Sequence, residues 1–540
     1  MPSVKEYRDW HSQLTNDEDF TNAQTLAQDV NSIFLPRRSD ITEQKSTGRG
    51  GWYDPIYEPA PINAVNTLAS GQYDILFTGD WFRSHAPTDN PTDEHKKAYD
   101  VIGDTMRKKI DKSNFALEIQ EFLTDRSAPH TSAMLTEWCK GRLRHTFIPF
   151  GQYAIAEDDE KNVDTLDRWF EITALQAKKK FNLDDDVLPK IVQEALKSPS
   201  TWSKKFKFIH MIHPNVDAEK GSEHKKDKPW KSVYFLSGGD EGDGFIREGG
   251  YDEQPFVVSR FNRYGNSVYG TGPCHQELGR GYTLQVQKRD FVALGERITN
   301  PGFLRLAGHG DTDIDPYRTN DISEEEAING YPREIQYANN VQLPFELFER
   351  DIKELKVSLF NDLFELLRSD MQREKTAYEV SKLLEEQVGR AAPTFNRLND
   401  EVLSVYLTRV FGILSRNGQF PREAVEAVGI PLEGNTYELP DPKIEFTSKL
   451  AMMMKAVKSN SVQSWMIENQ FWLNLHPEKI DNIDIDGQLR DSWEDNGLPQ
   501  KRLVPTDDRD KSRQARMEQE QGLMALQAGK EASEIEKNIR

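Results

Sequence analysis

One long amphipathic segment, residues 376–421, constrains the fold of this chain more than any other part. Thr376 and Glu379 have the spacing of a capping box, in which a hydroxyl and a carboxylate each accept a backbone N–H at the start of a helix. Apolar residues then recur at helical spacing through the segment, although Pro393 should kink the helix or restart it. Gly418 follows an asparagine in a typical C-cap signal. The pattern predicts a long, buried helix pair, which in most proteins only builds a core.

A hairpin of two further helices is predicted just before this segment. A strand and a glycine-rich turn lead into a helix over about 274–298, and a second, strongly periodic helix covers 343–369. Between them, residues 300–335 are rich in turn formers and contain short strands but no long helix. The two helices therefore form stems that carry a small head, and polar residues 370–375 make the turn into the next helix.

The remaining residues are predicted to mix helices with strands. Period-2 alternation over 142–173, around an acidic turn, indicates a β-hairpin, and short strands are expected at 206–214 and 232–236. The last helix has only a thin apolar stripe, so it either frays or packs against copies of itself. The other helices are expected over most of 61–140, from 176 to about 196, over 446–469 and over 513–540.

Length and composition favour a large or assembled protein. A chain of 540 residues can form several domains with sizeable cores. Apolar residues make up 36% and charged residues 29%, which are respectively low and high for a compact monomer. Much polar surface therefore stays in contact with water, as expected of an elongated protein or a subunit of a large ring.

The formal net charge of −20 limits the ways in which the chain can handle nucleic acid. Proteins that grip nucleic acid carry basic patches, because their affinity comes largely from neutralised phosphates and released counterions. The chain overall shows nothing of this kind. It either ignores nucleic acid, which charge alone favours, or lets it pass without holding it, which is what a conduit needs.

The sequence carries no signal for export or membrane insertion. Its N-terminus lacks an apolar signal-peptide core, and no stretch approaches the roughly 20 apolar residues that span a bilayer. The two cysteines, Cys139 and Cys274, lie far apart, which argues against a disulfide framework and for a reducing compartment. A soluble protein made in the cytoplasm, with no membrane partner, is expected.

No motif supports catalysis or a cofactor. His210 and His213 lie three apart on a predicted strand and so point to opposite faces, which disfavours a shared metal ion. The glycine- and aspartate-rich loop 238–244 and the aspartates of 481–486 lack calcium-binding spacing and are better explained as solvated turns. The turn 270–273 lacks a phosphate-binding signature. No nucleophile with a base stands out, so we expect no enzyme activity, no metal and no cofactor.

Several strings, in their shared order, resemble the head-to-tail connecting (portal) proteins of short-tailed bacteriophages. The resemblance covers roughly residues 60–500. The strings are Ser113-Asn114-Phe115, Ile148-Pro149-Phe150-Gly151, Asp167-Arg168-Trp169-Phe170, Tyr269-Gly270-Thr271-Gly272-Pro273, Asn300-Pro301-Gly302, the segment 376–421 and the helix from Phe446 through Leu450.

This resemblance implies a mainly α fold with α+β parts, the phage portal fold, assembled as a ring of typically twelve subunits around a DNA channel. It implies a virion protein at one capsid vertex, made in the bacterial cytoplasm. The implied regions are an N-terminal arm (1–60), a wing or body (61–272), stem helix 1 (273–299), the clip (300–340), stem helix 2 (341–369), the tunnel loop, tunnel helix and wing return (370–445), and the crown with the C-terminal helix (446–540).

The same resemblance supplies partners and candidate site residues. The expected partners are other copies of the chain, double-stranded DNA in the channel, the packaging terminase, tail adaptor or nozzle proteins, and the major capsid and scaffolding proteins. The candidates that would face DNA in the channel are Lys288, Arg289, Gln372, Arg373 and Lys375. The candidates in the clip that would dock these partners are Arg305, His309, Arg318 and Tyr331.

Two other interpretations remain open from the residues alone. The first is an acidic helical scaffold or adaptor without a DNA channel. The second is a metal-dependent hydrolase built on the histidine and aspartate clusters.

Overall fold

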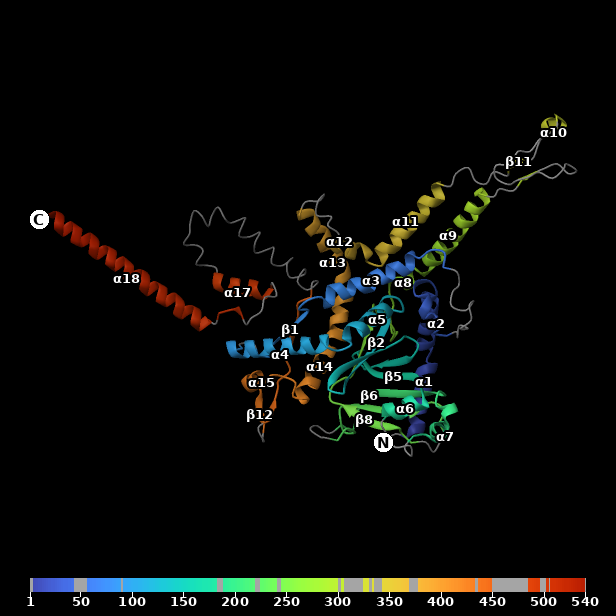
Figure 1. The fold of residues 1–540 in the computed structure, drawn as a ribbon, viewed down its shortest axis with the longest axis horizontal. Coiled ribbons are helices and arrows are strands. Elements are labelled where there is room, and N and C mark those ends of the chain that lie inside the picture. Colours follow the sequence, from blue (N-terminus) through green and yellow to red (C-terminus); the bar gives the residue numbers. More distant parts are fainter. Residues whose placement is uncertain are drawn as a thin grey trace. The chain divides into compact units, whose positions relative to one another are not determined.

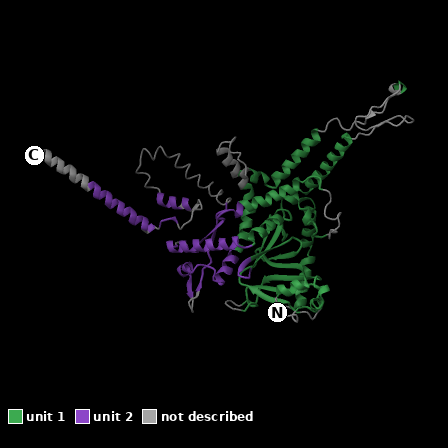
Figure 2. Cartoon of the chain, viewed as in Figure 1, with its two compact units in different colours: residues 1–74, 114–137, 144–406 green, residues 75–113, 138–143, 407–540 purple. Residues whose placement is uncertain are grey.

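The chain divides into two compact units in the computed structural model (Figure 1, Figure 2). Unit 1 contains residues 1–74, 114–137 and 144–406. Unit 2 contains residues 75–113, 138–143 and 407–540. The structure describes residues 3–42, 56–88, 91–181, 188–218, 224–239, 244–299, 303–304, 324–329, 333–334, 342–368, 377–432, 436–448, 484–495, 502–504 and 506–539.

The main sheet of unit 1 is antiparallel and has the strand order β4-β5-β6-β7-β8. Side chains of β6 alternate between its two faces: Phe206 and Phe208 pack with helices α6 and α7, whereas Ile209 and Met211 pack with α1. The predicted hairpin and the two predicted short strands are confirmed. The strands are β4 (Tyr153–Glu157), β5 (Val163–Thr173), β6 (Lys205–Pro214), β7 (Trp230–Leu236) and β8 (Arg247–Tyr251).

Helices cover both faces of this sheet. On one face, the single helix expected over about 176–196 is wrong, because α6 ends at Phe181 and α7 begins after Pro189. A proline disfavours helical backbone in the residue before it, which separates the two helices. On the other face, Tyr7 of α1 is buried among β6 and β7 side chains. The helices are α1 (Val4–Asn16), α2 (Glu18–Phe34), α6 (Ala174–Phe181) and α7 (Lys190–Leu196), with short 3-10 turns at Pro36–Arg38 and Pro199–Thr201.

A second, three-stranded sheet of order β3-β2-β9 corrects the expectation that 61–140 is mainly helical. The expected helices are present, but residues 131–139 form strand β2. Residues 131–136 are all buried, and a short run buried on both sides cannot be told from a buried helix by periodicity. The elements are α3 (Ala60–Phe77), α4 (Asp93–Asp111), α5 (Phe115–Ser127), β2 (Thr131–Cys139), β3 (Arg142–Ile148) and β9 (Phe256–Arg260).

The predicted helical hairpin is present in unit 1, with a break in each stem. The first break lies at Glu277 and the second at Phe360, whose φ of 57° is unusual for a bulky residue and ends the helix. The Phe364 ring then packs so closely on Gly71 of α3 that a Cβ there would overlap it. The elements are α8 (Pro273–Gln276), α9 (Leu278–Thr299), β10 (Phe303–Leu304), α10 (Glu324–Asn329), β11 (Arg333–Glu334), α11 (Gln342–Ser358) and α12 (Asn361–Arg368).

The long segment at 376–421 is helical from Ala377 through Arg416. Pro393 lies inside α13 (Ala377–Leu398), so the helix does not restart there. The irregularity comes later, as a π-helical stretch over Asn399–Ser404, after which α14 (Val405–Arg416) continues. Gly418 has φ 59°, as the predicted C-cap requires.

Unit 2 is built around a small antiparallel pair of strands, β1 with β14, beside helix α4. The start expected for a helix at 446 is wrong, because Lys443–Phe446 is strand β14; residues 449–483 lie outside the described part. The last helix begins seven residues earlier than expected, at Thr506. The elements are β1 (Phe82–His85), α15 (Arg422–Val428), β12 (Ile430–Leu432), β13 (Thr436–Glu438), β14 (Lys443–Phe446), α17 (Ile485–Asp495) and α18 (Thr506–Ile539).

The fold is therefore a mixed α and β structure. Among the described residues, no helix combines the length and the apolar character needed to cross a membrane. Cys139 and Cys274 do not form a disulfide.

Candidate functional site

The contacts that attach residues 377–406 to the rest of unit 1 centre on two buried arginines. Arg126 lies near the end of α5, and Arg260 is the last residue of β9. Both side chains are almost completely buried. Burying a guanidinium is costly unless its charge and its donors are satisfied, so the groups around these two residues determine where the helix can lie.

Arg126 donates to three neutral acceptors on three different elements. Its Nη1 lies 2.7 Å from Oε1 of Gln72 in α3, and its Nε lies 2.9 Å from Oγ of Ser259 in β9. Its Nη2 lies 2.8 Å from the carbonyl oxygen of Thr394, directly after Pro393 in α13. The guanidinium also lies 4.8 Å from the centroid of the Phe261 ring. Arg126 thus joins α13 to the body through a backbone carbonyl.

The charge of Arg126 is balanced from a distance. Burial lowers the pKa of Arg126 to about 9, and the negative charge of Glu401 opposes this shift. Arg126 therefore stays charged at neutral pH. Glu401 belongs to the π-helical stretch, so the irregular turn carries the carboxylate that compensates a buried cation on another element.

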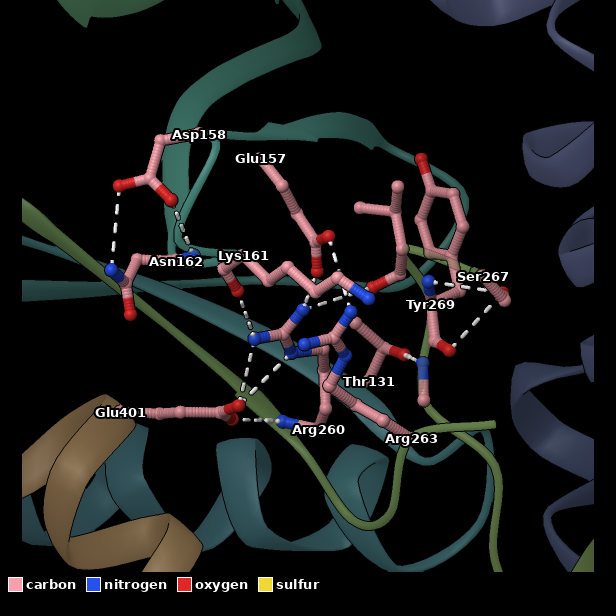
Figure 3. Close-up of polar contacts among 12 residues, drawn as sticks. Thr131, Glu157, Asp158, Lys161, Asn162, Arg260, Arg263, Ser267, Tyr269 and Glu401 are labelled. Carbon is pink, nitrogen blue, oxygen red and sulfur yellow. Dashed lines mark hydrogen bonds and ion pairs between the residues drawn. The ribbon is translucent and has the colours of Figure 1, made fainter. Parts of the chain in front are cut away.

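Arg260 contacts the same carboxylate directly (Figure 3). Its Nη2 lies 2.8 Å and its Nε 3.0 Å from Oε1 of Glu401, while its backbone N–H donates to Oε2 at 2.9 Å. On its other side Arg260 forms an ion pair with Glu157, and it donates to the carbonyl of Lys161 at 3.1 Å. Glu157 also accepts from Arg263 at 3.3 Å. One ion-pair network therefore connects the β4–β5 hairpin, β9 and the π-helical stretch.

The two stem helices pack as an antiparallel pair. Phe291 of α9 contacts Phe348 of α11 with ring centroids 5.5 Å apart, and nearer the body Arg280 donates to Glu354 at 2.8 Å. Leu284 of α9 and Leu355 of α11 are buried, and they share one hydrophobic core with side chains of α2 and α3. Contacts nearer the start of α9 fall later in α11, so the two helices run side by side in opposite directions, as Figure 1 shows.

The structure describes two of the five channel candidates, and both lie on α9. Lys288 is half-buried, with its Nζ 3.9 Å from Oε2 of Glu58 and 5.5 Å from the centroid of the Phe348 ring. Arg289 is exposed and donates to the adjacent Asp290 at 3.0 Å. Gln372, Arg373 and Lys375 lie outside the described residues, as do the four clip candidates Arg305, His309, Arg318 and Tyr331.

The described groups weighed for metal binding have other partners, whereas residues 240–243 and Asp481 lie outside the described part of the chain. His210 is buried, accepts from Arg168 at 2.9 Å and stacks on Tyr234, whereas His213 contacts the Tyr7 hydroxyl at 2.8 Å on the opposite face. Asp486 pairs with Arg513 of α18. In the part of the chain that the structure describes, no group of three or more histidines, cysteines or carboxylates is arranged to hold a metal ion.

The glycine turn before α8 has a packing role. A Cβ on Gly270 would overlap the carbonyl of His130, and a Cβ on Gly272 would lie 2.6 Å from Nδ1 of the same residue. His130 in turn accepts the Cys274 N–H at 3.1 Å. These glycines therefore let the first stem pack closely on β2, as expected for a tight strand-to-helix turn.

Comparison with known proteins decides the family. A family model described as "Bacteriophage head to tail connecting protein" matches residues 6–504. The chain belongs to this family. The resemblance noted in the sequence is confirmed, and the function is that of a portal, or head-to-tail connector.

Two curated relatives are similar over much of the chain. The portal protein of Salmonella phage epsilon15 is 26% identical over 546 aligned positions, covering 98% of this chain and 94% of that protein. The probable portal protein of Bordetella phage BPP-1 is 27% identical over 381 positions, covering 70% and 66% respectively. A solved chain titled "Virion of native gene transfer agent (GTA) particle" is 10% identical, with 85% and 94% covered; its TM-score of 0.34 supports no argument.

Sequence reasoning did not find Arg126, Arg260 or Glu401. Arginines are ordinarily read as solvated, and Arg126 stands between Asp125 and Ser127. Arg260 follows a mostly apolar strand run, residues 256–259, and precedes Phe261, and this context was the available sign of its burial. For Glu401 the sequence offered only a weak signal. It follows Asp400, and the two form a pair of adjacent carboxylates within an otherwise apolar helical stripe. Only the fold brings residues 126, 260 and 401 together.

Replacing Glu401 tests this arrangement. Glu401→Gln should lower the free energy of unfolding by about 3–5 kcal/mol, because it leaves Arg260 buried with one carboxylate fewer and removes the charge that stabilises Arg126. Denaturant unfolding of the purified protein measures the change. Asp400→Asn is the matched control, since Asp400 is the adjacent carboxylate and is exposed; it should change stability by less than about 0.5 kcal/mol. Equal effects of the two variants would contradict the assignment.

Proposed function

We propose that the chain assembles into a ring of typically twelve copies at one vertex of the phage capsid, around a channel through which double-stranded DNA is packaged and ejected. The observation that carries the proposal is the order of the elements in unit 1. An antiparallel helix pair, α9 with α11, encloses the segment 300–341 and is followed by a long helix attached to the body. With membership of the family, this order supports a stem, a clip and a channel-side helix.

The outward faces of the stem pair support assembly into a ring. Tyr282 and Val286 are exposed on α9, and Leu343 and Leu347 are exposed on α11, although all are large and apolar. In the proposed ring, one of these faces contacts the other face of the next copy. Such a head-to-tail contact generates a ring where the rotation between copies closes.

Helix α18 supports a further contact between copies. Residues 506–524 are largely exposed along its length, including Met517, Leu523 and Met524. An isolated helix with so little apolar surface is marginal in water. In the proposed ring, neighbouring copies of α18 cover these side chains and form the crown on the capsid side.

The remaining assignments follow from the position of each segment in the chain. Residues 300–340 would form the clip that docks the terminase and later the tail adaptor, and the wing would contact capsid and scaffolding proteins. Residues 370–375 would face DNA in the channel. A net charge of −20 per copy fits this role, because a wall that carries few cations guides DNA without binding it tightly. The proposed role is structural rather than enzymatic.

Imaging and mass measurement of the purified full chain test the proposal. We expect a ring with a central hole in negative-stain top views. The particle mass should equal the number of subunits counted in these views multiplied by the mass of one chain. A monomer would contradict the proposal. A particle without a hole would contradict it as well, and would favour an acidic scaffold or adaptor.

A charge reversal tests the channel assignment separately. Arg373→Glu combined with Lys375→Glu should leave the ring intact and reduce packaging or retention of DNA, because repulsion replaces weak attraction in the channel. Ring formation is measured by imaging, and packaged DNA by nuclease protection in assembled particles. The assignment is wrong if the double variant packages DNA normally or if it no longer forms the ring.

A further inference from the structure

Unit 1 carries a concentration of lysines that the overall charge conceals. Residues 171–207 contain eight lysines, five carboxylates and no arginine, which gives a local net charge of +3 in a chain of net charge −20. All eight are exposed, and four of them, on or next to helices α6 and α7 or directly before β6, define what we call the lysine surface: Lys179, Lys190, Lys197 and Lys204.

The fold brings these lysines together from three elements that pack on one another. Helices α6 and α7 contact each other and share a core with β6 that includes Phe181, Val192 and Phe206. Lys190 and Lys197 are seven residues apart, so they share the outer face of α7. Lys204 immediately precedes β6. The positive charge is therefore presented on a rigid support.

These four lysines are not neutralised within the described part of the chain. None of them forms an ion pair there, and Glu194, the exposed carboxylate of α7, forms none either. Lys204 instead lies over an aromatic ring, with its Nζ 5.4 Å from the Phe206 centroid. An aromatic face positions an ammonium group without cancelling its charge.

Two lysines in the loop before β7 behave differently. Lys226 forms an ion pair with Glu248, and Lys228 pairs with Asp252 at 2.7 Å. The chain thus pairs its lysines where a structural role requires it. The charge of the lysine surface is therefore available to bind a negatively charged partner outside the subunit.

The residue type indicates which partner fits. Protein interfaces are enriched in arginine and depleted in lysine, and carboxylates are best recognised by the planar guanidinium fork. A phosphate backbone requires only positive charge spread along its path, because binding comes from neutralised phosphates and released counterions. Screening over about 10 Å at ~0.1 M salt lets this surface act despite the acidic remainder of the chain.

We propose that the lysine surface binds the phosphate backbone of double-stranded DNA outside the channel. The phosphate chemistry follows from the lysines themselves, whereas the choice of DNA as the polymer rests on the proposed function. The contact is independent of base sequence and weakens with salt. It would hold DNA beside the portal while the acidic channel lets DNA pass.

Salt-dependent binding of a fluorescent DNA duplex to the assembled full-chain protein tests the proposal. Lys190→Gln with Lys197→Gln is compared with the matched pair Lys226→Gln with Lys228→Gln. Between ~50 and ~200 mM KCl, the plot of log affinity against log salt should lose about 0.9 of slope for each phosphate contact removed by the α7 pair. The control pair should keep the wild-type slope, and both variants should keep the wild-type melting temperature.

Two results would overturn the proposal: equal slopes for the α7 pair, the control pair and the wild type, or polyglutamate binding that depends on Lys190 and Lys197 as strongly as DNA binding does. The second result would identify an acidic protein as the partner. Failure here leaves the ring intact in images, whereas failure of the proposed function removes the ring or its hole, so the two failures are distinguishable.

Discussion

The architecture of unit 1 depends on a single carboxylate that serves two buried cations. Glu401 pairs directly with Arg260, and its charge also opposes the loss of charge on Arg126 caused by burial. Each guanidinium in turn contacts a different element, α13 for one and the β4–β5 hairpin for the other. Because an uncompensated buried charge costs several kcal/mol, the helix that carries Glu401 has few other positions available to it.

The backbone irregularities lie where this constraint acts. The π-helical stretch contains Glu401, and Pro393 immediately precedes the carbonyl that Arg126 binds. The left-handed Phe360 separates the second stem from α12, and its ring lies 5.1 Å from the guanidinium of Arg390 on α13. Such features are costly and persist only where surrounding contacts fix them. The stems and the long helix are therefore joined through strained but well-supported connections.

Much of this structure could be predicted from the sequence, and the limits have physical causes. Strong periodicity gave the stems and the long helix, and alternation gave the β4–β5 hairpin. Strand β2 was missed because a short run buried on both faces has no period of its own. The buried arginines were missed because burial of a charged residue is decided by partners distant in sequence, such as Ser259 and Glu401. Overall charge likewise concealed the lysines of 171–207, because a net value averages over surfaces that only the fold separates.

A double-mutant cycle between Arg126 and Glu401 tests the central claim most directly, because the two side chains interact through charge rather than through a hydrogen bond. Arg126→Met, Glu401→Gln and the double variant are compared with the wild type by denaturant unfolding. If Glu401 compensates Arg126, its replacement costs less once Arg126 is gone, with a coupling free energy of about 0.5–3 kcal/mol. Strictly additive effects would show that Glu401 acts on Arg260 alone and would contradict the account.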